Sequence, residues 1–370
     1  RRCSDEPSSA AKRERDRAMM TQDQEIICEI RGAAGVVVLN RPKALNALSL
    51  GMVRELARAL DAWESDPQVT RVVVISTSEK AFSAGGDIRW LHDCGKAGCH
   101  DEMLAFWGEE YILNHRIKTY PKPYVALIDG IVMGGGVGIS LHGSHRIAGD
   151  RYLFAMPEVG IGFFPDVGAT YALPRLEGGF GSFLALTGER VGAADALAAG
   201  LATHGVPSER MAELADALTK SGSLDDILAG FTLQRGPGPL HAERAVMAEA
   251  FTAPALPEVI ARLRRAAEQG SAFAGKLLQT IAVKSPTSVA IAFEQMRRGG
   301  SLDFAEAMRT EYRIVSRIAR GHDFYEGVRA VVIDKDQAPR WQPAALDEVR
   351  QADIDAYFAP LGADELKLEG

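Results

Sequence analysis

The chain of 370 residues is 46% hydrophobic, which is enough to build a core for one large domain or for a domain with an extension. Its formal net charge of -7 argues against nucleic acid as the main partner, although local Lys and Arg side chains can still bind phosphates. No apolar run reaches the roughly 18 residues of a membrane span. Four cysteines form no dense disulfide framework, which favours a reducing compartment.

A disordered leader is expected over residues 1–20. This segment is charged, contains Ser and Ala, and lacks the apolar stretch of a secretory signal. Its arginines allow a transit peptide, whereas its acidic residues count against one. Met19 or Met20 is a candidate for the natural start.

The first structured elements are predicted from the spacing of apolar residues. Residues 25–40 read as two strands joined by a turn that contains glycine. Apolar residues at helical spacing predict an amphipathic helix over residues 48–63. Short apolar runs at residues 72–75 and 124–128 are typical of buried strands.

Two loops in this part of the chain suit ligand binding. Residues 40–48 read NRPKALNAL, in which Arg41 or Lys43 could contact a phosphate or simply belong to a solvated turn. Residues 81–87 read AFSAGGD, and these small side chains let a ligand approach the backbone closely. Taken alone, the loop at residues 81–87 is weak evidence for a ligand-binding site, because glycine-containing loops of this kind are common turns.

The next segment carries little periodicity. Residues 91–107 show no clear pattern and are expected to be mobile, and a helix is predicted from Glu109 through Ile117. Glu109 and Glu110 form a pair of like charges, which usually marks a solvated helix face. The alternative is that one of them enters a binding pocket.

Consecutive glycines follow the strand at 124–128. Residues 133–138 read MGGGVG, and the segment after them can be helical. Glycines expose backbone N–H groups to a ligand, and the start of a helix adds partial positive charge. Such a site suits a carbonyl oxygen that becomes an oxyanion.

Two carboxylates follow on a largely apolar background. Glu158 lies in FAMPE and Asp166 in FPDVG. Apolar walls raise the pKa of a carboxylic acid and favour acid–base chemistry. The predicted catalytic residues are therefore Glu158 and Asp166.

Possible metal ligands are sparse. Cys94, Cys99 and His100 lie close in sequence, as do His142 and His145. A surface segment in the first case and structural roles in the second are the favoured interpretations, since no second ligand pair is evident. No metal site is predicted.

The rest of the chain is expected to be mostly helical. Two regions are predicted, a core over residues 21–205 and a helical region over 206–370, with a Pro/Gly-rich link at 234–239. Individual helices are expected over residues 257–268, 272–282, 289–298 and 302–319. The glycines are not a nucleotide P-loop, because no Gly-Lys-Ser/Thr follows them.

The blocks GGGVG, FAMPE and FPDVG, together with NRPKALNAL and AFSAGGD, stand in the order and spacing of the crotonase (enoyl-CoA hydratase/isomerase) superfamily. Within it the chain resembles the 3-hydroxyisobutyryl-CoA hydrolase branch, over nearly everything after Met20. The resemblance implies an α/β fold, in which ββα units form a spiral and a helical C-terminal region follows.

The resemblance also implies roles for individual residues. The N–H groups of Ala84 and Gly135 would form an oxyanion hole. Glu158 would attack the thioester or activate water, and Asp166 would hold the water, tune Glu158 or bind the substrate hydroxyl. The remaining residues expected to bind substrate are Glu110, Gly85, Gly86, Asp87 and Gly134. Coenzyme A would enter as part of the substrate, with no separate cofactor.

Departures from the superfamily pattern separate its branches. Enoyl-CoA hydratases carry a glutamate where this chain has Gly138 and usually a glycine where it has Asp166. Dienoyl-CoA isomerases carry an acid at both positions. Hydrolysis of a short 3-hydroxyacyl-CoA in valine breakdown is therefore the best match. An isomerase or hydratase, and a non-catalytic acyl-CoA-binding protein, remain the alternatives.

The expected partner is a small acyl-CoA molecule, with neither nucleic acid nor membrane, and a homo-oligomer is possible. The resemblance implies a cytoplasmic protein if the source is bacterial and a mitochondrial matrix protein if it is eukaryotic.

Overall fold

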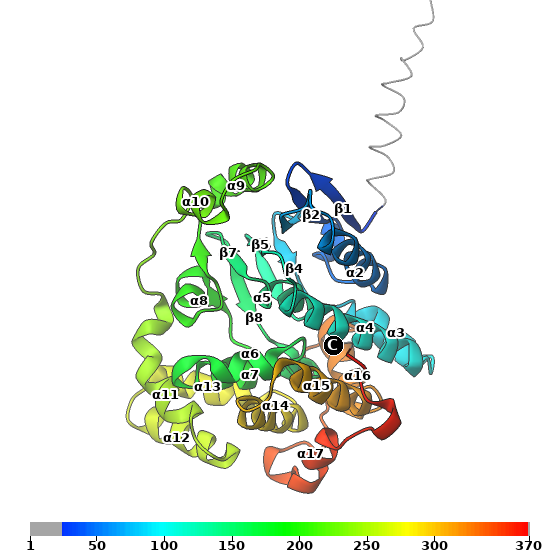
Figure 1. Ribbon diagram of the computed structural model, residues 1–370. Helices are drawn as coiled ribbons and strands as arrows, with labels where there is room; N and C mark the ends of the chain where they lie inside the picture. The colour runs from blue at the N-terminus through cyan, green and yellow to red at the C-terminus, as the bar shows by residue number, and fades with distance from the viewer. Residues whose placement is uncertain (1–23, 369–370) are drawn as a thin grey trace, which may run out of the picture.

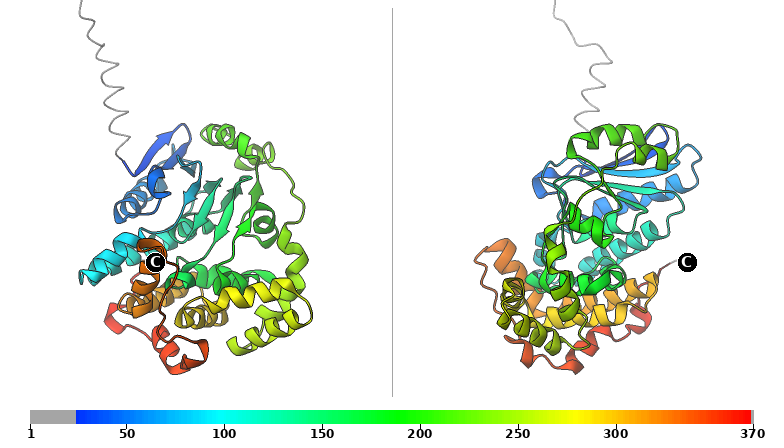
Figure 2. Two further views of the ribbon diagram at one scale, coloured as in Figure 1. Left: turned by 180° about the vertical axis from the view of Figure 1, so that it is seen from behind. Right: turned by 90° about the vertical axis from the view of Figure 1, so that its left-hand side faces the viewer.

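The computed structural model describes residues 24–368 and consists of two β-sheets above a thick layer of helices (Figure 1). A view from the side shows the sheets and their flanking helices in one layer and most of the later helices in another (Figure 2). The leader predicted over residues 1–20 lies outside the described residues. Within the described part, no helix combines the length and the hydropathy needed to cross a bilayer.

The larger sheet has six strands in the order β1-β2-β3-β5-β7-β10. Their bounds are β1 (Ile26–Arg31), β2 (Ala34–Leu39), β3 (Arg71–Ser76), β5 (Tyr124–Ile128), β7 (His145–Ala148) and β10 (His204–Gly205). β1 and β2 form the predicted antiparallel hairpin, and the other neighbours are parallel. Every residue of β5 is buried, which explains its continuous apolar run.

The smaller sheet has four strands in the order β4-β6-β8-β9. They are β4 (Ala81–Ser83), β6 (Ile131–Met133), β8 (Leu153–Ala155) and β9 (Val191–Gly192). Consecutive strands alternate between the sheets, so that β3, β5 and β7 join the larger one while β4, β6 and β8 join the smaller one. Each turn of the chain thus adds one strand to each sheet, which confirms the expected α/β spiral.

Helices of the first half cover and connect these sheets. They are α2 (Leu50–Glu64), α3 (Ile88–Lys96), α4 (His100–Lys118), α5 (Gly135–Leu141), α6 (Ala169–Ala172), α7 (Phe180–Thr187) and α8 (Ala193–Ala199). The prediction of a mobile segment over residues 91–107 is wrong, because most of α3 and the first part of α4 occupy it. α4 is buried on several sides, so its apolar residues form no single stripe and its periodicity was weak.

Helices dominate after β10, as expected. They are α9 (Met211–Leu218), α10 (Leu224–Ala229), α11 (Arg244–Phe251), α12 (Leu256–Glu268), α13 (Ala272–Ala282), α14 (Pro286–Gly299), α15 (Phe304–Ile318), α16 (His322–Val328) and α17 (Gln351–Phe358). Short helical turns join the elements: η1 (Pro42–Ala44), η2 (Glu158–Ile161), η3 (Leu173–Arg175), η4 (Glu177–Gly179), η5 (Ser208–Arg210), η6 (Pro239–Glu243), η7 (Arg329–Ile333), η8 (Leu346–Glu348) and η9 (Gly362–Asp364).

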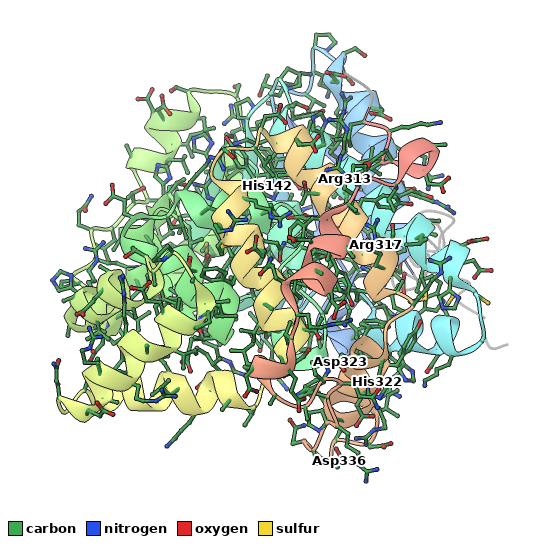
Figure 3. The ribbon with its side chains drawn as sticks, turned by 90° about the horizontal axis from the view of Figure 1, so that it is seen from below. His142, Arg313, Arg317, His322, Asp323 and Asp336 are labelled. Atoms are coloured by element: carbon green, nitrogen blue, oxygen red, sulfur yellow. The ribbon has the colours of Figure 1, made fainter. Side chains whose placement is uncertain are left out.

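The C-terminal helices divide between the two layers. α9 and α10 pack on the larger sheet, where Leu214 and Leu228 share a buried cluster with Val36 and Val73. α13 to α17 lie in the lower layer with α6 and α7 (Figure 1). Arg317 of α15 donates a hydrogen bond to the Tyr357 carbonyl oxygen at 3.1 Å, which ties α17 to this layer (Figure 3).

Candidate active site

Two glycine-containing loops emerge side by side from the smaller sheet. β4 and β6 are parallel neighbours, with Ser83 opposite Val132, so the loop after each strand leaves the same edge. A Cβ on Gly85 would lie 3.4 Å from the Met133 carbonyl oxygen and 3.6 Å from the Gly135 nitrogen. The two loops predicted to meet therefore do so, and glycine permits their close approach.

The structure changes the expected pair of oxyanion donors. Gly135 is the first residue of α5, and an N–H group at this position has no intrahelical partner. The Ala84 N–H, by contrast, already donates to the Leu45 carbonyl oxygen at 3.0 Å, so Ala84 is not the free donor expected. The Gly86 N–H has no hydrogen-bond partner in the described chain, and its nitrogen lies 3.3 Å from where a Cβ on Gly135 would stand. The free pair is thus Gly86 and Gly135.

Glu110 and its neighbour Glu109 point in different directions from α4. Glu109 forms a surface ion pair with Arg54 at 2.6 Å. Glu110 is buried, its Oε1 has no hydrogen-bond partner among residues 24–368, and a Cβ on Gly135 would collide with that oxygen. Burial, together with Asp166, raises the pKa of Glu110 well above its usual range. Of the two adjacent glutamates, it is Glu110 that faces the glycine loops.

Glu158 begins the short turn η2 directly after β8. Its side chain is buried, and Oε1 lies 3.3 Å from the position of a Cβ on Gly134. Its Oε2 has no hydrogen-bond partner within the part of the chain that the structure describes. Burial and the nearby Asp166 raise the pKa of Glu158 well above its usual range. An unpartnered carboxyl oxygen beside the oxyanion loop is placed to react with a bound group.

Tyr111 orients the carboxyl group of Asp166. The Tyr111 hydroxyl donates a hydrogen bond to Asp166 Oδ2 at 2.9 Å, and both side chains are buried. Burial raises the pKa of Asp166 to about 7, and the Tyr111 hydrogen bond opposes this rise. No pattern in the sequence indicates this role for Tyr111, because its partner Asp166 lies 55 residues away.

These groups line one cavity of about 600 Å³. The glycine loops and the three carboxyl groups Glu110, Glu158 and Asp166 form its floor. Segments from the C-terminal half complete the wall: Ala282, Val283, Lys284, Val331, Gln337, Ala338, Pro339 and Trp341. The Trp341 ring N–H donates to the Val283 carbonyl oxygen at 3.1 Å, so the late segments support one another. The cavity therefore needs both halves of the chain.

A family model described as enoyl-CoA hydratase/isomerase matches residues 34–358, which include the whole of the cavity. The chain belongs to the enoyl-CoA hydratase/isomerase family. The family expected from the glycine and carboxylate motifs is thereby confirmed.

Relatives within this family carry two kinds of name. The mitochondrial 3-hydroxyisobutyryl-CoA hydrolase of Xenopus tropicalis is 47% identical over 94% of this chain and 92% of its own. The Homo sapiens protein of that name is 44% identical over 93% and 91%. Among solved structures, a carnitinyl-CoA dehydratase from Mycobacterium thermoresistibile has a TM-score of 0.89 at 40% identity, covering 94% of this chain and 100% of that one. An enoyl-CoA hydratase from Rhodobacter sphaeroides has 0.87 at 39%, with 93% and 100% covered.

In this enoyl-CoA hydratase/isomerase family member, a fourth buried carboxylate supports Asp166. Glu311 of α15 accepts hydrogen bonds from the Gly168 N–H at 2.8 Å and the Thr170 N–H at 2.9 Å. The turn between Asp166 and α6 has positive φ at Val167 (52°) and Gly168 (89°), which is a strained conformation. The two hydrogen bonds to Glu311 hold this turn in place. Glu311 could not be predicted from the sequence, because a helical glutamate 143 residues from Gly168 gives no local sign of such a contact.

The surroundings of Gly138 leave no room for a larger residue. A Cβ there would lie 2.8 Å from Asn114 Nδ2 and 2.8 Å from Val167 Cβ. Asn114 is fully buried, and neither polar atom of its amide has a hydrogen-bond partner in the described chain. An acid at position 138, as the resemblance implies for hydratases, therefore does not fit this packing.

Asp87 does not join the site as expected. Its Oδ1 accepts the Trp90 N–H at 3.1 Å, which caps α3, and Oδ2 forms an ion pair with Arg41 at 2.8 Å. Asp87 is absent from the cavity lining, so the prediction that it binds substrate is corrected to a structural role. Arg41 also forms an ion pair with Glu25 at 2.8 Å. Its guanidinium group, a candidate for binding a phosphate, is therefore neutralised by two carboxylates.

The histidines after the glycines have structural surroundings. The His142 Nε2–H donates to the Val167 carbonyl oxygen at 2.6 Å, and burial lowers the pKa of His142 to about 4. A neutral His142 thus holds the turn that follows Asp166 in the sequence, through the Val167 carbonyl oxygen. His145 instead contacts Ser144 and lies beside the ring of His204.

Proposed function

We propose that this protein hydrolyses the thioester of a short 3-hydroxyacyl-CoA, most directly 3-hydroxyisobutyryl-CoA, and releases the hydroxy acid and coenzyme A. One observation carries the proposal: Glu110, Glu158 and Asp166 converge in the cavity where the N–H groups of Gly86 and Gly135 have no partner among the described residues. The names of relatives 44–47% identical over most of the chain support the same reaction. The resemblance places it in valine breakdown.

The two N–H groups would bind the thioester carbonyl oxygen. As the carbon becomes tetrahedral, this oxygen gains negative charge, and both hydrogen bonds strengthen. Loss of one such donor typically lowers the rate by about 10²–10³. The positive end of α5 adds to this stabilisation, since Gly135 is its first residue.

Glu158 would supply the attacking group in one of two ways. Its carboxylate can attack the carbonyl carbon and expel the coenzyme A thiolate, which leaves a mixed anhydride for water to cleave. Alternatively, it can take a proton from a water molecule that attacks directly. Asp166 would orient that water, and Glu110 would bind the substrate hydroxyl. Coenzyme A enters with the substrate, and the mechanism requires no separate cofactor.

The hydrolase proposal is tested by mixing the purified protein with 3-hydroxyisobutyryl-CoA and measuring the release of free thiol. The E158Q variant should lose at least about 10²-fold in kcat, given the usual weight of acid–base or nucleophilic catalysis. E109Q is the matched control, because Glu109 pairs with Arg54 on the surface, and it should retain activity. Absence of thiol release by a folded protein that binds coenzyme A would leave the non-catalytic binding protein as the better interpretation.

A hydratase or isomerase is the second candidate, favoured by the names of the solved structures at 39–40% identity. The packing at Gly138 opposes it, because the second acid of that chemistry has no space. The two reactions can be distinguished by offering crotonyl-CoA, which is an unsaturated substrate for hydration, in parallel with the hydroxyacyl-CoA. Hydration faster than thiol release from the hydroxyacyl substrate would reverse the assignment.

The two roles of Glu158 can be distinguished by a single turnover in oxygen-labelled water. An anhydride that is opened at the enzyme carboxyl carbon leaves label in Glu158, which mass spectrometry of the peptide detects. Direct attack of water on the thioester carbon places label only in the product acid, as does opening of the anhydride at the substrate carbonyl carbon, so label in Glu158 is the result that establishes the anhydride route.

Substrate choice and location follow as parts of the same proposal. 3-Hydroxypropionyl-CoA differs from the preferred substrate by one methyl group, which a pocket distinguishes by only roughly 1–3 kcal/mol. The vertebrate relatives are named mitochondrial. We propose the mitochondrial matrix for this protein if it is eukaryotic and the cytoplasm if it is bacterial.

A further inference from the structure

Two cysteines meet where α3 ends. Gly98 has φ 84°, its N–H donates to the Gly95 carbonyl oxygen at 3.0 Å, and the Cys99 N–H donates to the Cys94 carbonyl oxygen at 3.0 Å. This pair of bonds is a Schellman motif, in which the residues at the positions of Cys94 and Cys99 make a side-chain contact. In most helices that contact is hydrophobic, whereas here both members are thiols.

The sulfur atoms are close. Cys94 Sγ, Cys99 Sγ and a carboxyl oxygen of Glu102 lie within 4.8 Å of one another. Cys94 Sγ also donates to the Cys99 carbonyl oxygen at 3.2 Å. Because the backbone bond between Cys94 and Cys99 keeps their Cα atoms near each other, rotation of the side chains is enough to bring the sulfurs together.

The two thiols differ in access to solvent. Cys94 is buried, whereas Cys99 is partly exposed. Burial, with contributions from Cys99 and Glu102, raises the pKa of Cys94 to about 11. A reagent in solution therefore reacts with Cys99 first, and the buried Cys94 is the second thiol, which reacts with the oxidised Cys99.

We propose that Cys94 and Cys99 form an oxidation site that closes to an intrachain disulfide. With a peroxide as oxidant, the Cys99 thiolate attacks an oxygen, the O–O bond breaks, and Cys99 becomes a sulfenic acid as the first water is released. Cys94 sulfur then attacks Cys99 sulfur and gives up its proton, the S–O bond breaks, and the departing hydroxide takes up that proton and leaves as the second water. In total, two thiols lose two hydrogens and one peroxide is reduced to two waters.

A metal ion is the other ligand that such a cluster could take, and the geometry favours it less. A structural zinc site takes four protein ligands, and the group found in the described chain has three. The nearby His100 is turned away, with Nε2 at 3.3 Å from the Tyr325 hydroxyl oxygen. A disulfide needs only the two sulfurs.

The site is connected to the cavity through its two helices. Ile88 and Leu91 of α3 and Trp107 of α4 line the cavity, and the disulfide would join the end of the first helix to the start of the second. The junction also packs on α16, since a Cβ on Gly95 would collide with the Tyr325 hydroxyl. Oxidation would thus fix a junction that supports the cavity wall, whatever reaction the cavity performs.

The test uses the full chain with C3S and C28S, so that Cys94 and Cys99 are the remaining thiols. The protein is exposed to hydrogen peroxide, alkylated, digested with trypsin and analysed by mass spectrometry. Trypsin cleaves after Lys96, between the cysteines, so the disulfide appears as two linked peptides that separate on reduction. Most of the protein is expected in this form.

Adding C94S provides the second measurement. Without its partner, Cys99 should accumulate sulfinic acid, which gains two oxygens and resists reduction. The proposal is overturned if both thiols are alkylated after peroxide treatment of the folded protein. It is also overturned if the purified protein retains one equivalent of zinc that blocks alkylation, because the cluster is then a metal site.

Discussion

At the scale of single residues, adjacent side chains of α4 serve two parts of the site. Glu110 faces the backbone of Gly135, while Tyr111 donates to Asp166. Successive helical residues differ by about 100° in direction, which suits them to neighbouring targets. We infer that Tyr111 is a positioning residue that stabilises the carboxylate form of Asp166.

The Y111F variant tests this inference through pH. Removing the hydroxyl leaves Asp166 without its donor and raises the pKa of the coupled Glu158–Asp166 pair. The acid limb of the kcat/KM profile should move to higher pH by roughly 0.5–1 unit, as expected for one hydrogen bond. Y120F is the control, because Tyr120 donates to the Leu60 carbonyl oxygen outside the site. A uniform loss of rate at every pH would indicate a purely structural role.

Gly135 offers a second test at this scale. A Cβ there would collide with Glu110 and lie 3.1 Å from Leu48 Cδ1, so G135A should displace the proposed donor or the acid. A fall in kcat of about 10²-fold or more is expected, measured as thiol release. G192A is the matched change, since a Cβ on Gly192 would meet no atom of the described chain within 4 Å. Equal activity in the two variants would contradict the proposed oxyanion site.

At the scale of elements, α15 and α6 are joined by a side chain. Glu311 accepts the Gly168 and Thr170 N–H groups at the start of α6, so it anchors the turn after Asp166. The C-terminal region therefore stabilises the catalytic loop as well as closing the cavity.

The E311A variant tests whether Glu311 stabilises the turn after Asp166, and it should unfold more easily than the unmodified protein. Two buried N–H groups would lose their acceptor, at a cost of roughly 2–4 kcal/mol in the free energy of unfolding. Urea denaturation at neutral pH measures the change. E268A, at the exposed end of α12, should alter stability little. If both variants unfold alike, Glu311 does not hold the turn.

Elements with a single apolar face or a local motif could be predicted from the sequence. The β1–β2 hairpin, α2 and the glycine loop at α5 are examples. The first part of α4 was missed because burial on several sides removes the stripe on which such predictions depend. α3 has a single buried face that includes Leu91 and Cys94, but it spans only nine residues and also carries Arg, His, Asp and Lys, so few apolar residues mark it. The donor at Ala84 was misplaced because the Leu45 carbonyl oxygen that uses its N–H is brought there by the fold. Glu311 and the wall around Trp341 depend on contacts over more than a hundred residues, which local patterns do not encode.

At the scale of the molecule, buried acids link stability to pH. Burial raises the pKa of Asp166 from 3.8 to about 7 and, together with Asp166, that of Glu311 from 4.5 to about 8. Each group has a higher pKa when folded, so its stabilising effect is complete below the unfolded pKa and is lost as pH rises through the folded one.

The free energy of unfolding should therefore fall between about pH 5 and pH 8. The slope contributed by each acid is at most about 1.4 kcal/mol per pH unit. Urea titrations across this range measure it, and E311Q, which cannot ionise, should flatten the curve. A stability that stays constant or increases toward pH 8 would show that these carboxyl groups are already ionised in the folded protein at low pH.

The tight packing around Gly138 bears on how one reaction could evolve into another within the family. A lineage that acquired a glutamate at position 138 would meet the Asn114 amide at once, so the first mutation alone would be purged as a packing defect. A prior or simultaneous change must shorten Asn114 and also relieve the contact with Val167, because a Cβ at position 138 would lie 2.8 Å from each of these side chains. Positions 114, 138 and 167 should therefore change together whenever descendants of this fold exchange water-assisted cleavage for addition across a double bond.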